Sequence, residues 1–136
     1  MGLAERRAAK DFETKRFPQL KEAIDKAACF AVAVEVAWEK LAAPDQAHLY
    51  EESWEKVYFR PLAEAFTAIC IDDMGKEALK ASLKKVVITN SGGTYYGDRI
   101  ATFSDGVLTL DHEPCTNVDD VADRTTGIRK VLESAL

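Results

Sequence analysis

The chain has 136 residues, of which 47% are hydrophobic and 30% charged, a balance typical of a folded globular domain and not of a disordered chain. Eighteen Lys and Arg against 23 Asp and Glu give a net charge of -5, which argues against a sequence-independent grip on nucleic-acid phosphates. The first residues lack the apolar core of a signal peptide, and no stretch reaches the ~18 apolar residues of a membrane span. We therefore expect one cytoplasmic domain over residues 1–136, with neither nucleic acid nor membrane as a partner.

Residues 3–16 are predicted to form a charged helix whose large apolar side chains are mainly Leu3 and Phe12. Pro18 is expected to interrupt this helix and to start a second one that ends at Ala28. A helix as short and polar as the first is marginal in water and needs a surface to pack on. We hypothesise that it projects from the core and packs on a second copy of the chain, giving a homo-oligomer; a frayed terminus is the alternative.

The next segments alternate between strand and helix patterns. Residues 30–36 place Phe30, Val32, Val34 and Val36 on one side, which predicts the first strand. A long helix is predicted from about residue 47 to 70, kinked at Pro61, followed by a helix over 74–83 that Asp72 or Asp73 caps. The cysteines Cys29, Cys70 and Cys115 are odd in number and lack a C-x-x-C spacing, so Cys29 and Cys70 are expected to be small buried hydrophobes.

Asp105-Gly106, between two runs of alternating polarity, is the strongest local signal in the chain, because this dipeptide favours a two-residue β-hairpin. The predicted pairs are Ser104 with Val107, Phe103 with Leu108, Thr102 with Thr109, and Ala101 with Leu110. Residues 86–88 before the hairpin predict an interior strand, and a last helix is expected after Thr116 or Asn117. Gly127 within that helix weakens it by ~1 kcal/mol relative to Ala.

The fold class follows from the order of these elements. The connections between the strands after residue 84 look too short for parallel crossovers. We therefore predict an α+β fold, a two-layer domain with a four-stranded, mostly antiparallel sheet and helices packed on one face.

The stretch from Asp111 to Cys115 contains four side chains that can bind metals, but it does not indicate a metal site. Neighbouring strand residues such as Asp111 and His112 point to opposite faces, and the chain has only one other histidine, His48. We predict neither a metal nor a cofactor. His112 and Cys115 are also considered as a base and a nucleophile, although their spacing does not establish hydrogen-bond reach.

The loop over residues 90–98 contains three glycines but leads into a strand and lacks the known phosphate-binding patterns. Tyr95 and Tyr96 near its tip are the best candidates for ligand or partner contact, because exposed tyrosines offer a large apolar area with a polar end.

Two functional hypotheses follow. The first, which we favour because no catalytic signature is present, is a non-enzymatic module that binds another protein or itself. The alternative is a small enzyme or ligand-binding protein with a pocket between the sheet and residues 47–70, in which His48, His112 and Cys115 are the candidate reactive groups.

Overall fold

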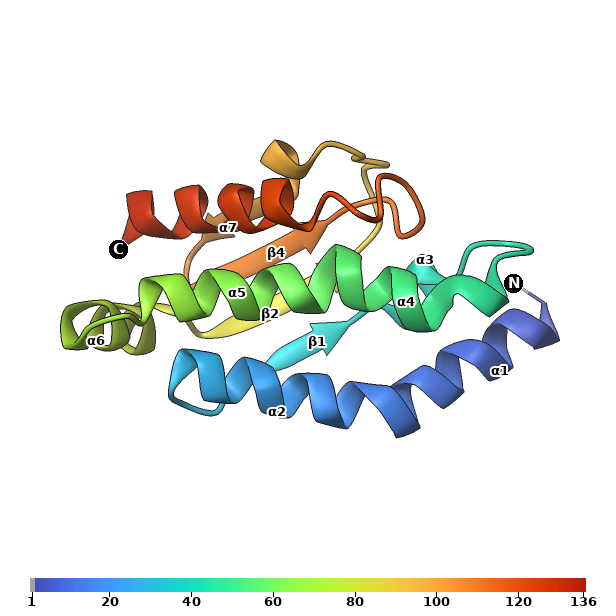
Figure 1. Cartoon of the computed structure of the whole chain (residues 1–136), viewed down its shortest axis with the longest axis horizontal. Helices are drawn as coiled ribbons and strands as arrows, with labels where there is room; N and C mark the ends of the chain where they lie inside the picture. The colour runs from blue at the N-terminus through green and yellow to red at the C-terminus, as the bar shows by residue number, and fades with distance from the viewer. Residues whose placement is uncertain (1) are drawn as a thin grey trace.

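The computed structural model describes residues 2–136, and its helices and strands are interleaved along the chain (Figure 1). The α-helices are α1 (Leu3–Asp11), α2 (Phe17–Ala28), α3 (Trp38–Leu41), α4 (Tyr50–Trp54), α5 (Arg60–Ile69), α6 (Asp73–Ser82) and α7 (Val121–Ala135). Two π-helical turns, η1 (Phe12–Arg16) and η3 (Glu55–Phe59), and two 3₁₀ turns, η2 (Ala47–Leu49) and η4 (Gly97–Arg99), extend or connect them. The strands are β1 (Val34–Val36), β2 (Lys85–Thr89), β3 (Ala101–Ser104) and β4 (Val107–Asp111).

The four strands form one sheet in the order β1-β2-β4-β3, and it is mostly parallel. β2 runs parallel to both β1 and β4, whereas β3 and β4 are antiparallel. The prediction of a mostly antiparallel sheet is therefore wrong. The physical reason is that β2 does not pair with the strand that follows it. The loop after β2 carries the chain to the sheet edge as β3, and the hairpin returns it as β4 between β3 and β2, so the β2–β4 connection contains a whole strand.

The predicted hairpin is confirmed in all four residue pairs. Ala101 lies opposite Leu110, Thr102 opposite Thr109, Phe103 opposite Leu108 and Ser104 opposite Val107. Asp105 and Gly106 have φ of 53° and 81°, the left-handed conformation that a two-residue turn of this type requires at both positions. The interior position predicted for residues 86–88 is also confirmed, because β2 lies between β1 and β4.

The strand predicted over residues 30–36 is shorter than expected. Only Val34–Val36 is a strand, because the amide of Val32 donates to the Asp25 carboxylate over 2.9 Å instead of to a neighbouring strand.

Neither Pro18 nor Pro61 ends its helix, contrary to the interruption predicted at Pro18. Each proline follows a π-helical turn: the amide of Phe17 donates to the carbonyl of Phe12, and the amide of Arg60 donates to the carbonyl of Glu55. In a π-turn the backbone hydrogen bond spans five residues instead of four, so the turn is wider. The wider turn accommodates a proline, which lacks an amide hydrogen and crowds the preceding turn. The chain is consequently helical without a break from Leu3 to Ala28.

The N-terminal segment packs on its own chain and does not project from it. Phe12 is 4% exposed, and its ring lies 5.1 Å from Trp54 and 5.7 Å from both Trp38 and Phe59, measured between ring centroids. This aromatic cluster is the surface that the short helix needs. The N-terminal helix therefore has a packing surface on its own chain and does not need a second copy of the chain to supply one.

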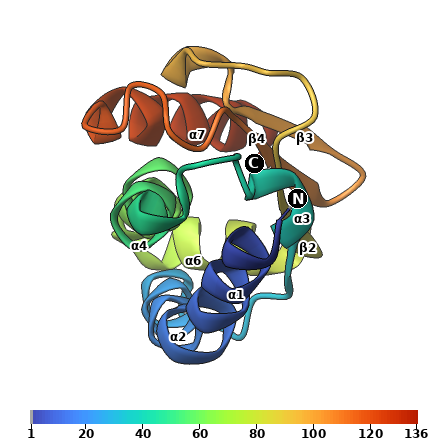
Figure 2. The same cartoon turned by 90° about the vertical axis from the view of Figure 1, so that its right-hand side faces the viewer.

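Helices α2, α4 and α7 stand on the same side of the sheet (Figure 2). The long helical segment over residues 50–69 fills the centre with fully or almost fully buried side chains: Trp54, Val57, Tyr58, Leu62, Ala65 and Phe66. These side chains occupy the interface at which the sequence predicted a pocket. None of the helices within residues 2–136 combines the length and apolar content that a bilayer span requires.

Candidate functional site

The three residues predicted as reactive groups lie in different environments. His48 lines a surface groove between α1 and α4, whereas His112, just after β4, is completely buried, and Cys115 is half-buried. No hydrogen bond joins any two of them within residues 2–136. The structure therefore does not assemble a nucleophile and a base from these residues.

His112 is held as a buried neutral histidine. Its Nδ1 lies 2.7 Å from the carbonyl oxygen of Glu113, and its own carbonyl accepts a hydrogen bond from the Tyr58 hydroxyl. Nε2 is buried and has no hydrogen-bond partner among the described residues. Burial lowers the pKa of His112, and the nearby Arg124 guanidinium adds to the effect. This environment favours a structural role over proton transfer with a solvent-borne substrate.

Cys115 has the properties of a weakly reactive thiol. Burial raises its pKa, with the Ser53 hydroxyl opposing the shift in part and the negative charge of Glu113 adding to it. A reactive cysteine requires the opposite, a neighbouring cation or base that stabilises the thiolate.

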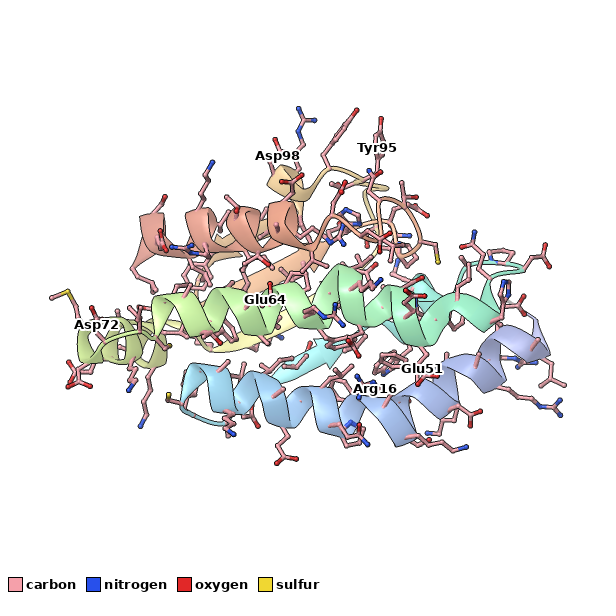
Figure 3. All side chains as sticks on the ribbon, in the orientation of Figure 1. Arg16, Glu51, Glu64, Asp72, Tyr95 and Asp98 are labelled. Atoms are coloured by element: carbon pink, nitrogen blue, oxygen red, sulfur yellow. The ribbon has the colours of Figure 1, made fainter. Side chains whose placement is uncertain are left out.

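Tyr95 and Tyr96, by contrast, border a groove of about 320 Å³ between the η4 region and α7. We call it the tyrosine–aspartate groove. Its lining residues are Tyr95, Tyr96, Gly97, Asp98, Asn117, Asp120, Asp123, Thr126, Gly127, Lys130 and Val131. Tyr95 and Asp98 both extend outward from this edge of the molecule (Figure 3).

The two tyrosines form an exposed aromatic pair. Tyr95 is 47% exposed and Tyr96 54%, and their ring centroids are 4.5 Å apart. The hydroxyl of Tyr95 raises the pKa of Tyr96 above its ordinary value, so the Tyr96 hydroxyl is neutral near pH 7. The pair thus presents two electron-rich ring faces and two neutral hydroxyls to a ligand.

The groove is lined by acidic side chains from both η4 and the α7 region, and their charge is not neutralised among residues 2–136. Asp98, Asp120 and Asp123 face one cation, Lys130, so the lining carries a net charge of -2. Across residues 2–136, the carboxylates of these three aspartates form no ion pair within 4.0 Å and accept no hydrogen bond. Their negative charge is therefore available to a ligand.

A buried arginine holds the segment that carries this acidic wall. The Arg124 guanidinium donates to the carbonyl oxygens of Asn117 over 2.6 Å, Val118 over 2.5 Å and Lys56 over 3.1 Å. It is completely buried and makes no ion pair among the described residues, so these carbonyls compensate part of its lost hydration, while its Nε is buried without a hydrogen-bond partner there. Asn117 in turn donates its side-chain amide to the Tyr95 carbonyl over 2.7 Å and thereby links the acidic wall to the tyrosines.

Two glycines bring η4 against α7. A Cβ placed on Gly127 would lie 2.3 Å from the carbonyl oxygen of Gly97, and a Cβ on Gly97 would lie 2.8 Å from the amide nitrogen of Arg124. Both positions therefore require glycine, because the neighbouring atoms belong to the backbone and cannot rotate away. This contact explains why Gly127 stands inside a helix that it weakens.

A second, larger groove of about 1020 Å³ lies between α1 and α4 and contains His48. Its charges balance, since its four acidic residues, Asp11, Glu51, Glu52 and Glu55, face the four basic residues Lys15, Arg16, Lys56 and Arg60. Several are already paired: Glu55 accepts from both Arg16 and Arg60, and Lys56 donates to Glu52 and Asp119. In Figure 3, Arg16 and Glu51 lie in the space between the two helices. This groove offers little uncompensated charge to a ligand.

Tyr95 and Tyr96 are the contact residues that the sequence predicts, whereas the aspartates, Arg124 and the glycine contact emerge only from the structure. The sequence predicts Asp119 and Asp120 in the first turn of the last helix, where carboxylates are common, and it does not single out Asp98 or Asp123. The unexplained Gly127 was the available signal, because a glycine in the middle of a helix often marks a close backbone approach.

Within residues 2–136, no three His, Cys, Asp or Glu side chains converge as the ligands of a metal ion would. Comparisons of the chain with protein-family models, curated proteins and solved structures found no match.

Proposed function

We propose that this protein is a non-enzymatic binding module that holds a basic segment of a partner protein in the tyrosine–aspartate groove. The observation that carries the proposal is the exposed pair Tyr95 and Tyr96 beside three aspartates whose carboxylates have no partner among the described residues. An Arg or Lys side chain satisfies both features at once, because it stacks on the ring face and pairs with carboxylates.

The chemistry of the groove favours a cation over other ligands. An anion meets repulsion from Asp98, Asp120 and Asp123 and finds only Lys130 to pair with. A purely apolar ligand leaves the carboxylates without compensation. Tyrosine is also enriched among the residues that dominate binding energy at protein interfaces, since it buries a large area at a small cost in side-chain entropy.

The expected affinity for a short peptide is low. A cation–π contact at an exposed site contributes about 0.5–1 kcal/mol, and an exposed ion pair about 0.2–1 kcal/mol. Two contacts of the first kind and three of the second sum to about 2–5 kcal/mol, which corresponds to a Kd of about 0.2 mM or weaker. A complete partner protein binds more tightly if it covers surface around the groove.

The alternative hypothesis, a small enzyme or ligand-binding protein, has less support. The candidate reactive groups His48, His112 and Cys115 lie in separate environments, and the interface between the sheet and residues 47–70 is filled by side chains.

The test is a titration of the ¹⁵N-labelled protein with a blocked Gly-Arg-Gly-Arg-Gly peptide, followed by NMR at low ionic strength. We expect shift changes concentrated in residues 95–98 and 117–131 and reduced at high salt. A Gly-Glu-Gly-Glu-Gly peptide is the control for the sign of the charge.

Two variants locate the interaction. Tyr95→Ala combined with Tyr96→Ala, and Asp98→Asn combined with Asp123→Asn, should each weaken binding at least threefold. A matched control, Glu51→Gln with Glu77→Gln, removes the same charge away from the groove and should leave binding unchanged. Shift changes spread evenly over the surface, or unaffected by the groove variants, would refute the proposal.

A further inference from the structure

We propose that Cys29 and Cys70 form a redox-sensitive pair, which closes to an intramolecular disulfide when a peroxide oxidises Cys29. This inference is independent of the tyrosine–aspartate groove. It rests on the way in which two packed helices end beside each other.

The C-terminal ends of α2 and α5 lie next to each other at the same end of the molecule (Figure 1), and the two helices pack along their length. Cys29 is the residue that ends α2, and Cys70 is the residue that ends α5. Two cysteines that are 41 positions apart in the sequence are therefore brought to one corner of the fold.

The contact between these ends involves the Cys70 sulfur itself. Cys70 Sγ lies 3.7 Å from the carbonyl oxygen of Ala28, which belongs to the peptide bond that joins Ala28 to Cys29. Within this peptide unit, the Ala28 oxygen and the Cys29 Cα are about 3 Å apart, so the distance from Cys70 Sγ to the Cys29 Cα is at most about 7 Å. A disulfide joins Cα atoms about 4.4–6.8 Å apart, and the Cys29 sulfur lies 3.7 Å from the carbonyl oxygen of Lys26 in its own helix, so closure requires the Cys29 side chain to turn toward Cys70.

The two thiols differ in exposure to solvent, as a pair that a peroxide oxidises in two steps requires. Cys29 is exposed, which overturns its predicted burial, whereas Cys70 is buried as predicted. Cys29 also has a left-handed backbone with φ of 65°, at the start of the irregular segment before β1. An exposed residue at a chain turn can move toward its partner at small cost, since few packed contacts restrain it. Because peroxide in solution reaches the exposed Cys29 before the buried Cys70, Cys29 reacts first and Cys70 second.

The proposed chemistry has two steps. The Cys29 thiolate attacks one oxygen of hydrogen peroxide, the O–O bond breaks, and the products are a Cys29 sulfenic acid and, after protonation, water. The Cys70 thiolate then attacks the Cys29 sulfur, the S–S bond forms, and the S–O bond breaks with release of hydroxide, which takes up a proton. In sum, two thiols are oxidised, one peroxide is reduced, and two waters leave.

The third cysteine provides an internal control. Cys115 lies beside the Ser53 hydroxyl of α4, in a different part of the fold from the ends of α2 and α5. It should therefore stay a free thiol while the other two are consumed.

The experiment treats the folded full chain with hydrogen peroxide at neutral pH, removes the oxidant and counts free thiols in denaturant. The count should fall from three to one in the unsubstituted protein and from two to none in Cys115→Ser. Peptide mapping without reductant should find Cys29 joined to Cys70. Cys29→Ser should keep both remaining thiols, and Cys70→Ser should accumulate a Cys29 sulfenic acid that dimedone traps.

Three results would overturn the proposal. These are a count that stays at three in the unsubstituted protein, a cross-link that includes Cys115 or joins two molecules, and a Cys29–Cys70 link that forms only after urea has unfolded the chain. Thermal unfolding of each variant before oxidation shows that the compared proteins are folded.

Discussion

Replacing Gly127 with alanine sets two physical effects against each other. The substitution removes the flexibility of a glycine in the middle of α7, and helix propensity alone predicts a gain in stability of about 1 kcal/mol. In the structure, however, the new Cβ would lie 2.3 Å from the carbonyl oxygen of Gly97 and 3.4 Å from the Cα of Asp98.

The steric effect is the larger of the two. The distance to the Gly97 oxygen must increase by about 1 Å to reach ordinary van der Waals contact. Because this oxygen belongs to the backbone, the whole η4 turn must move away from α7. Overpacking of this kind costs typically about 1–3 kcal/mol, and the loss of contact between η4 and α7 adds to the cost. We expect a net destabilisation of about 2 kcal/mol, or about 7 °C in Tm for a domain of this size.

The assay is chemical and thermal unfolding of Gly127→Ala beside Ser134→Ala, a control in the exposed last turn of the same helix. Ser134 donates only to the carbonyl of Lys130, so its substitution should change stability by less than about 0.5 kcal/mol. Displacement of η4 also moves the tyrosines, and the Gly-Arg peptide should bind Gly127→Ala more weakly. If Gly127→Ala raises stability by about 1 kcal/mol, helix propensity dominates and the close contact is refuted.

Further predictions concern the turn, the buried histidine and the buried arginine. Gly106→Val should destabilise the protein by about 2–3 kcal/mol in urea unfolding, because φ is 81° and a Cβ would meet Lys84, whereas Asp105→Asn keeps a favoured turn and should be nearly neutral. Burial lowers the pKa of His112, so below pH ~6.5 the unfolded chain binds a proton that the folded chain does not. The free energy of unfolding should therefore decrease as the pH is lowered, until His112 in the folded chain is protonated as well. His112→Gln should flatten this dependence, and an equal slope in the variant and the unsubstituted protein would contradict the assignment. Arg124→Lys should cost about 2–4 kcal/mol, because a single ammonium cannot reach all three carbonyls, and unchanged stability would show that these bonds contribute little.

The sequence by itself determined the features that depend on neighbouring residues. Asp105-Gly106 specifies a turn with positive φ at both positions, and the alternation on either side leaves only one register that places Leu108 and Leu110 in the core. The sequence also places Tyr95 and Tyr96 in a loop that contains glycines, but only the structure shows that both are exposed and that neither covers the core.

Only the tertiary structure decided which distant segments meet. The position of β4 between β2 and β3 depends on packing over the whole sheet. No local sequence pattern predicts that β2 pairs with β4 and not with β3, the strand that follows it. The same holds for the candidate site: Asp98 and Asp123 lie on separate elements, and Gly97 and Gly127 become necessary only when η4 meets α7. Arg124, Cys29 and Cys70 show the same limit, because the burial and partners of a side chain depend on segments far away in the chain, whereas turn geometry depends on a few adjacent residues.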